Sequence, residues 1–165
     1  MSSGVLVNTE CQSKFQQLSE GKHGIRYIIF KIEGREIVVD VAVTSEEMGI
    51  TVDDYEVSSQ EAFEHFVKDL KQRTDDFKDC RYAVFDFKFM CNRPGAGASK
   101  MGKIVFFQLC PDGAPIKKKM VYASSASSIK ASLGTDKILQ FQVSDESEIA
   151  HKEVLSKLME KFRDN

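Results

Sequence analysis

Two neighbouring apolar segments constrain the fold of this chain more than any other feature. Residues 103–110 (KIVFFQLC) form a nearly continuous apolar run, which is typical of a strand covered on both faces. Residues 81–90 (RYAVFDFKFM) alternate instead, and the four residues expected on one side are Ala83, Phe85, Phe87 and Phe89. The opposite side would carry Tyr82, Val84, Asp86 and Lys88. Together the two segments predict the centre of a sheet with a layer on each side.

The rest of the chain supplies further strands and helices around this pair. Strands are predicted at 26–33, 36–44 and 137–143. Helices are predicted after an Asn8 or Thr9 cap, from Ser58 or Ser59, from Pro115 to about Leu133, and after a Ser144 or Ser147 cap to about Phe162. Residues 1–7 are expected to form an arm, and residues 91–102 a Gly-rich hairpin loop. The order predicts an α/β fold in a single domain, 1–165, with a mixed sheet of about five strands and helices on both faces.

Charge and cysteine content narrow the class of protein. The net charge is −2 over 165 residues, so no global basic field would attract nucleic acid. The four cysteines (Cys11, Cys80, Cys91 and Cys110) form no C-x-x-C pair, which argues against a zinc site and favours reduced thiols in a cytosolic protein. No apolar run approaches membrane-spanning length.

The helix that begins near Pro115 carries Lys117, Lys118 and Lys119 in its first turn. That end of a helix already bears the positive end of the macrodipole, so each exposed cation there costs about 0.3–1 kcal/mol. The run therefore predicts an anionic partner, although most lysine runs are solvated surface. Ile116 and Met120 flank the lysines and suggest a protein-binding patch with an apolar centre and a basic rim. Alternatively, Met120 belongs to the core.

No catalytic motif accompanies this turn. The loop GAGASKMG lacks the phosphate-loop spacing, there is no G-x-S-x-G elbow, and the three histidines lie in separate predicted elements. The sequence therefore favours a binding protein without a cofactor over an enzyme.

Residues 110–125 (CPDGAPIKKKMVYASS) closely resemble the long actin-binding helix of the ADF/cofilin family and the residues that lead into it. The N-terminus MSSGV and the strand RYAVFD at 81–86 also resemble segments of that family, and the likeness extends over residues 4–162. It implies an ADF-homology fold in a monomer that binds actin and promotes filament depolymerisation. By this resemblance Lys117, Lys119 and Met120 contact the actin monomer, together with Ser3, Gly4 and Val5 of the N-terminal arm.

The resemblance also implies regulation and a second surface. Phosphorylation of Ser3 would switch actin binding off, because added negative charge repels an acidic partner. Phosphoinositide headgroups would compete for Lys117, Lys118 and Lys119. Filament binding would use Lys100, Lys103 and Lys157.

This chain departs from the family at the filament surface. Met101 and Ser156 stand where charged residues are expected, and Glu160 reverses the sign. We therefore expect filament-side binding and severing to be weaker than in typical relatives.

Two other interpretations use the same helix end. One is a membrane-surface module that responds to phosphoinositides, with actin secondary. The other is an enzyme for an anionic substrate, which lacks a plausible nucleophile or base near Lys117. The expected location is the cytoplasm and its actin cytoskeleton; residues 28–39 contain no counterpart of the basic insert that serves vertebrate members as a nuclear signal, which leaves nuclear import open.

Overall fold

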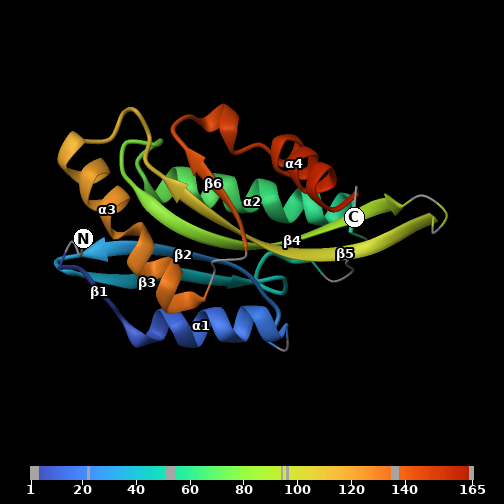
Figure 1. The fold of residues 1–165 in the computed structure, drawn as a ribbon, viewed down its shortest axis with the longest axis horizontal. Coiled ribbons are helices and arrows are strands. Elements are labelled where there is room, and N and C mark those ends of the chain that lie inside the picture. Colours follow the sequence, from blue (N-terminus) through green and yellow to red (C-terminus); the bar gives the residue numbers. More distant parts are fainter. Residues whose placement is uncertain are drawn as a thin grey trace.

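A curled six-stranded sheet with helices on both faces forms the molecule (Figure 1). The computed structural model describes residues 4–21, 23–50, 55–93, 95, 97–134 and 138–163. Its strands are β1 (Leu6–Val7), β2 (Ile25–Glu33), β3 (Glu36–Thr44), β4 (Arg81–Arg93), β5 (Gly97–Leu109) and β6 (Leu139–Val143). Its helices are α1 (Thr9–Glu20), α2 (Val57–Arg73), α3 (Ile116–Leu133), the short 3₁₀ helix η1 (Glu146–Glu148) and α4 (His151–Arg163).

The sheet has the order β1-β3-β2-β4-β5-β6 and is mixed, as predicted. The two edge strands β1 and β6 pair in parallel with their neighbours, and the other pairs are antiparallel. The count of about five strands omitted β1, because the sequence assigned residues 1–7 to an arm. Leu6 and Val7 instead align with Glu36 and Ile37 of β3.

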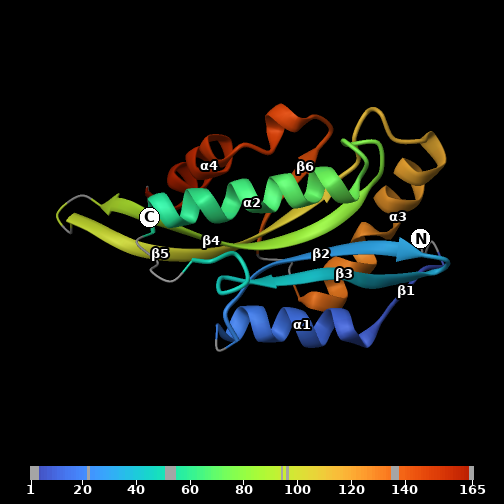
Figure 2. The same ribbon diagram turned by 180° about the vertical axis from the view of Figure 1, so that it is seen from behind.

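Each face of the sheet has its own hydrophobic core, and the alternation in β4 sorts residues between them as predicted. Phe85, Phe87 and Phe89 pack with α2 and α4 on one face. Tyr82 and Val84 pack with α1 and α3 on the other. Figure 2 shows α2 and α4 together on the same side of the curled sheet. The sheet therefore holds two helical layers that bury separate apolar surfaces.

Residues 91–102 are mostly strand, so the predicted long loop is wrong. The β4–β5 ladder continues to the pair Arg93↔Gly97. Cys91 is buried and extends the inward alternation of Phe87 and Phe89 beyond the segment identified from sequence. Gly95 and Gly97 have φ of 78° and 69°, so these glycines serve the turn, where positive φ is needed.

Two predicted helix caps are also wrong. Helix α2 begins at Val57, and Ser59 is buried within its first turn, where its hydroxyl donates a hydrogen bond to the Lys88 carbonyl. Ser144 and Ser147 do not cap α4; Asp145 caps η1, and α4 begins only at His151. The Asn8 cap of α1 and the Gly134 stop of α3 are confirmed.

Candidate functional site

The first turns of α3 expose an apolar patch. Among the residues that the structure describes, five large hydrophobic side chains are exposed, and three of them lie here. Ile116 is 71% exposed, Met120 65% and Val121 40%. Met120 is therefore a surface residue and not part of the core. Clustered apolar side chains of this kind, beside charged neighbours, are typical of a protein-binding surface.

Two tyrosines fix this helix to the sheet. The Tyr122 hydroxyl accepts a hydrogen bond of 2.8 Å from the backbone N–H of Ile32 in β2. The hydroxyl of Tyr82 in β4 donates to the backbone carbonyl of Tyr122. Both tyrosines are buried, and their rings lie 5.1 Å apart. The exposed patch consequently stands on a rigid support.

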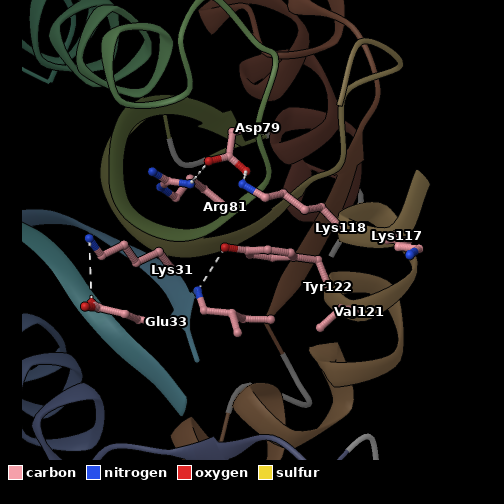
Figure 3. Close-up of a pocket in the computed structure, with 9 residues that line it drawn as sticks. Lys31, Glu33, Asp79, Arg81, Lys117, Lys118, Val121 and Tyr122 are labelled. Atoms are coloured by element: carbon pink, nitrogen blue, oxygen red, sulfur yellow. Dashed lines mark hydrogen bonds and ion pairs between the residues drawn. The ribbon is translucent and has the colours of Figure 1, made fainter. Parts of the chain in front are cut away.

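The three lysines of the run have different surroundings, and Figure 3 shows those of Lys117 and Lys118. Lys118 turns toward Asp79, and its ammonium lies 3.1 Å from the carboxylate. Arg81 binds the other oxygen of Asp79 at 3.0 Å. Asp79 therefore offsets one of the cations that sequence alone placed at the helix start without compensation. Lys117 is exposed and lies apart from this cluster, and Lys119 is half-buried.

Ion pairs continue from Asp79 across the end of the sheet. Arg81 also binds Asp40 of β3 at 3.1 Å, and Asp40 receives a second bond of 3.1 Å from Arg73 of α2. Arg73 in turn pairs with Asp69 at 2.8 Å. We call Asp69, Arg73, Asp40, Arg81, Asp79 and Lys118 the ion-pair chain.

The ion-pair chain has an electrostatic effect on Asp79. Burial alone would raise the pKa of its carboxyl, but hydrogen bonds from Arg81, the Cys80 amide and Lys118 outweigh burial. They hold the pKa of Asp79 below its usual range. Asp79 is thus held in its charged form, which keeps Lys118 in place.

A hollow beside the start of α3 could accept an anion, but most of its charges are already paired. Lys117, Lys118, Lys31 and Arg81 line it with Glu33 and Asp79. Lys31 pairs with Glu33 at 3.8 Å, while Arg81 and Lys118 both pair with Asp79. The phosphoinositide interpretation therefore depends chiefly on Lys117 here.

The three lysines predicted to bind filaments lie on β5 and α4, separate from α3. Lys100 and Lys103 lie on β5, and Lys157 lies on α4 (Figure 1). The ammonium of Lys100 is 5.3 Å from the centre of the Tyr55 ring, and that of Lys157 is 5.9 Å from the Phe141 ring. Cation–π contacts of this kind hold these side chains against their own protein.

Residues that depart from the family pattern lie on the same two elements. Met101 is partly buried against the core, whereas Ser156 and Glu160 are exposed on α4. These positions supply no cation to the surface around Lys157.

Two contributors to these surfaces were missed from sequence. Asp79 was assigned no role, because its lysine partner lies 39 positions away. Lys161 was also missed, although it follows Lys157 by one helical turn; it lines a hollow with Lys103. A helical projection of α4 could have identified Lys161, whereas no local signal identifies Asp79.

The N-terminal arm is described from Gly4 onward. Ser3, the predicted phosphorylation site, lies outside the described residues. Gly4 is exposed with a φ of 79°, and Val5 packs partly against the core beneath α1 and α3. The described part of the arm therefore borders the same layer as α3.

A metal site and a membrane span have no candidates in the described part of the chain. Within it no three His, Cys, Asp or Glu side chains are grouped so that they could hold a metal ion. No helix among the described residues is both long and apolar enough to cross a membrane.

Comparison with known proteins gives a consistent result. Residues 4–159 match the model of the cofilin/tropomyosin-type actin-binding proteins. The chain is 65% identical to actin-depolymerizing factor 1, isoforms a/b, of Caenorhabditis elegans, with 94% of this chain and 74% of that protein aligned. It is 37% identical to cofilin of Schizosaccharomyces pombe, over 96% and 98% of the two chains. The solution structure of the ADF-like UNC-60A protein of C. elegans superimposes with a TM-score of 0.84 at 65% identity, and each chain is covered completely.

Proposed function

Because this chain belongs to the cofilin/tropomyosin-type family of actin-binding proteins, which are not enzymes, we propose that it binds actin monomers through the start of α3. The observation that carries the proposal is the exposed patch of Ile116, Met120 and Val121 beside Lys117. An acidic partner with an apolar cleft matches this patch in charge and in polarity. Lys119 and the arm residues Ser3, Gly4 and Val5 complete the proposed monomer site.

The protein promotes filament depolymerisation and turnover, and it binds filament sides and severs more weakly than typical relatives. Lys100, Lys103 and Lys157 form the proposed filament surface. Support for its weakness comes from the cation–π contacts of Lys100 and Lys157 and from the uncharged or acidic residues at Met101, Ser156 and Glu160. The protein acts as a monomer in the cytoplasm, at the actin cytoskeleton.

High-speed pelleting of filamentous actin with increasing amounts of this protein tests both parts. We expect actin to move to the supernatant together with the protein, while little protein pellets. If the amount of this protein in the pellet instead rises with the amount of pelleted actin, the expectation of weak filament binding is wrong. The proposed function itself would be wrong if actin stays in the pellet without this protein and this protein also fails to bind actin monomers.

Ser3 provides a regulatory switch in this proposal. Ser3→Glu adds a negative charge to the arm next to an acidic partner and should weaken monomer binding. Fluorescence titration of labelled monomeric actin measures the affinity, with Ser3→Ala as the matched neutral control. Equal affinities for Ser3→Glu and the unmodified protein would remove the switch.

An alternative function is a membrane-surface module that binds phosphoinositides through Lys117, Lys118 and Lys119. The ion pair between Lys118 and Asp79 counts against it, because it leaves Lys118 less available. Flotation with vesicles that contain phosphatidylinositol bisphosphate separates the two functions. Binding that survives physiological salt while monomer affinity is low would favour the membrane.

A further inference from the structure

Two cysteines adjoin the last residue pair of the β4–β5 ladder. Arg81 of β4 pairs with Leu109 of β5, so Cys80 and Cys110 are the next residues beyond the last pair of the ladder. Neighbouring residues on antiparallel strands lie about 4.5–5.5 Å apart between Cα atoms, and disulfides need about 4.4–6.8 Å. Both side chains belong to the same core, where Cys80 is buried and Cys110 packs against it. If the register continues by one residue, the Cα atoms of Cys80 and Cys110 lie within the range that a disulfide can bridge.

The two thiols are suited to different roles. Cys80 is fully buried, whereas Cys110 is only partly buried and receives a 3.9 Å hydrogen bond from Gln108. The neighbouring thiol of Cys80 lowers the pKa of Cys110 against the opposing effect of burial, and Gln108 and Lys119 act in the same direction as Cys80. Cys110 is therefore the thiol that reaches the thiolate form and meets an oxidant first.

We propose that Cys80 and Cys110 form a reversible disulfide when the protein meets a hydroperoxide. The Cys110 thiolate attacks one oxygen of hydrogen peroxide, the O–O bond breaks, and the departing hydroxide takes a proton to become water. Cys80 then attacks the sulfenic sulfur of Cys110. The S–O bond breaks, and the second hydroxide leaves as water with the proton of Cys80. Two thiols are oxidised to one disulfide, and one peroxide is reduced to two molecules of water.

The bridge would act on the start of α3. Cys80 lies between Asp79 and Arg81 of the ion-pair chain, and Cys110 precedes the short segment that leads into the lysine run. Bond formation draws the two sulfur atoms closer together than they lie as thiols, so it moves this segment relative to Asp79. This consequence rests on the proposed actin function: we expect oxidation to reduce monomer affinity about fivefold, at the lower end of typical coupling between sites.

Peptide mapping tests the disulfide without any assumption about actin. The reduced full-length protein is treated with hydrogen peroxide, blocked with N-ethylmaleimide and digested with trypsin. We expect a linked pair of peptides, 79–81 and 104–117, that dithiothreitol separates. The link should persist in Cys11→Ser, where another buried cysteine is changed, and vanish in Cys110→Ser. Full alkylation of Cys80 and Cys110 after peroxide treatment, or links to other cysteines, would overturn the proposal.

A second measurement addresses the consequence. Monomeric actin is titrated with reduced, oxidised and re-reduced protein, with Cys110→Ser treated in parallel. Affinity should fall on oxidation, recover with dithiothreitol and stay constant in the variant. A mapped bridge with unchanged affinity would overturn the regulatory role. Failure of the reduced protein to bind actin would instead contradict the proposed function and leave the mapped disulfide intact.

Discussion

The start of α3 and the region formed by outer β5 and α4 both carry lysines, yet they are built differently. At the start of α3, Lys117 and Lys119 flank exposed apolar side chains. The lysines of the other region are spread over two elements, and those at 100 and 157 lie against aromatic rings. The two regions lie toward opposite ends of the long axis of the molecule (Figures 1 and 2). Basic charge is common to both, whereas exposed apolar surface distinguishes the first.

This difference has an energetic consequence. Apolar area buried on binding contributes about 25 cal/mol per Å² before the costs of association, and salt does not screen it. Exposed charges separated by more than about 8 Å are largely screened at physiological ionic strength. A partner at the start of α3 should therefore stay bound as salt rises, and a partner at the lysines of β5 and α4 should dissociate first.

The largest expected effect comes from removal of Lys117 and Lys119, the two lysines of the run that do not pair with Asp79 in the ion-pair chain. Lys117→Ala with Lys119→Ala should weaken monomer binding by about 2 kcal/mol or more, roughly thirtyfold in Kd, because the acidic groups of actin would lose their partners in a desolvated interface. Titration of labelled monomeric actin measures this loss, and circular dichroism should show an unchanged fold.

A matched control removes two positive charges from a different part of the surface. Lys68→Ala with Lys152→Ala removes two exposed lysines from α2 and α4. We expect this double variant to bind actin monomers as the unmodified protein does. If both double variants lose the same affinity, net charge and not the surface at α3 determines binding, and the contrast between the two regions fails.

Asp79 should account for the next largest effect, this time on stability. Asp79→Asn leaves Arg81 and Lys118 without their carboxylate, and loss of a charge-assisted partner costs about 1–3 kcal/mol. Because the ion-pair chain lowers the pKa of Asp79 in the folded state, its contribution is present above the unfolded pKa of about 4 and is lost as pH falls through the folded value. Urea unfolding as a function of pH measures the difference.

The variant and the unmodified protein should therefore converge in stability at strongly acidic pH. A constant gap between them down to that pH would mean that packing, and not the charge of Asp79, is responsible. Lys118→Met alone should cost less than Asp79→Asn, because Lys118 is half exposed at its side chain.

Filament binding by the region of outer β5 and α4 should become stronger when cations are introduced there. Met101→Lys with Glu160→Lys should strengthen filament co-pelleting by up to about 1 kcal/mol, roughly fivefold in Kd, and raise its dependence on salt. Met101→Leu with Glu160→Gln is the neutral control. Monomer affinity should not change in either variant. If the amount of protein that pellets with filaments does not change, missing positive charge is not the sole cause of weak filament binding.

The layered fold follows from periodicity, which sequence shows directly. Phe85, Phe87 and Phe89 lie two residues apart and face one core, as alternation predicts. The outer β4–β5 hairpin escaped prediction because its glycines are typical of loops. Its strand structure depends on pairing between residues such as Cys91 and Ser99, which local propensity does not show.

The sequence predicted where the candidate site lies, but it did not predict the ion pairs within it. The exposure of Met120 agrees with the patch expected from the lysine run. The pairing of Lys118 with Asp79 depends on tertiary structure, because 39 residues separate the partners and the fold alone brings them together. The same limit applies to Cys80 and Cys110, because 30 residues separate them and only the strand register brings them together.

The smallest expected effect concerns His151, the first residue of α4. Its ring stacks on Phe87 at 5.0 Å and lies 5.8 Å from Phe63. Burial lowers the pKa of His151, although the charge of Glu64 opposes this effect. The unfolded chain therefore binds a proton more readily than the folded protein, so stability should fall as pH drops from about 6.5 toward the lowered folded value.

His151→Phe should remove this part of the pH dependence, since the replacement ring cannot be protonated. His23→Gln, which changes an exposed histidine, should preserve it. Hydrogen exchange near pH 6 would locate the effect, and we expect α4 to lose protection before α3. Because α4 carries Lys157, filament binding should then weaken on mild acidification while monomer binding persists. Equal loss of protection in both helices would mean that His151 acts on the whole fold and does not separate the two regions.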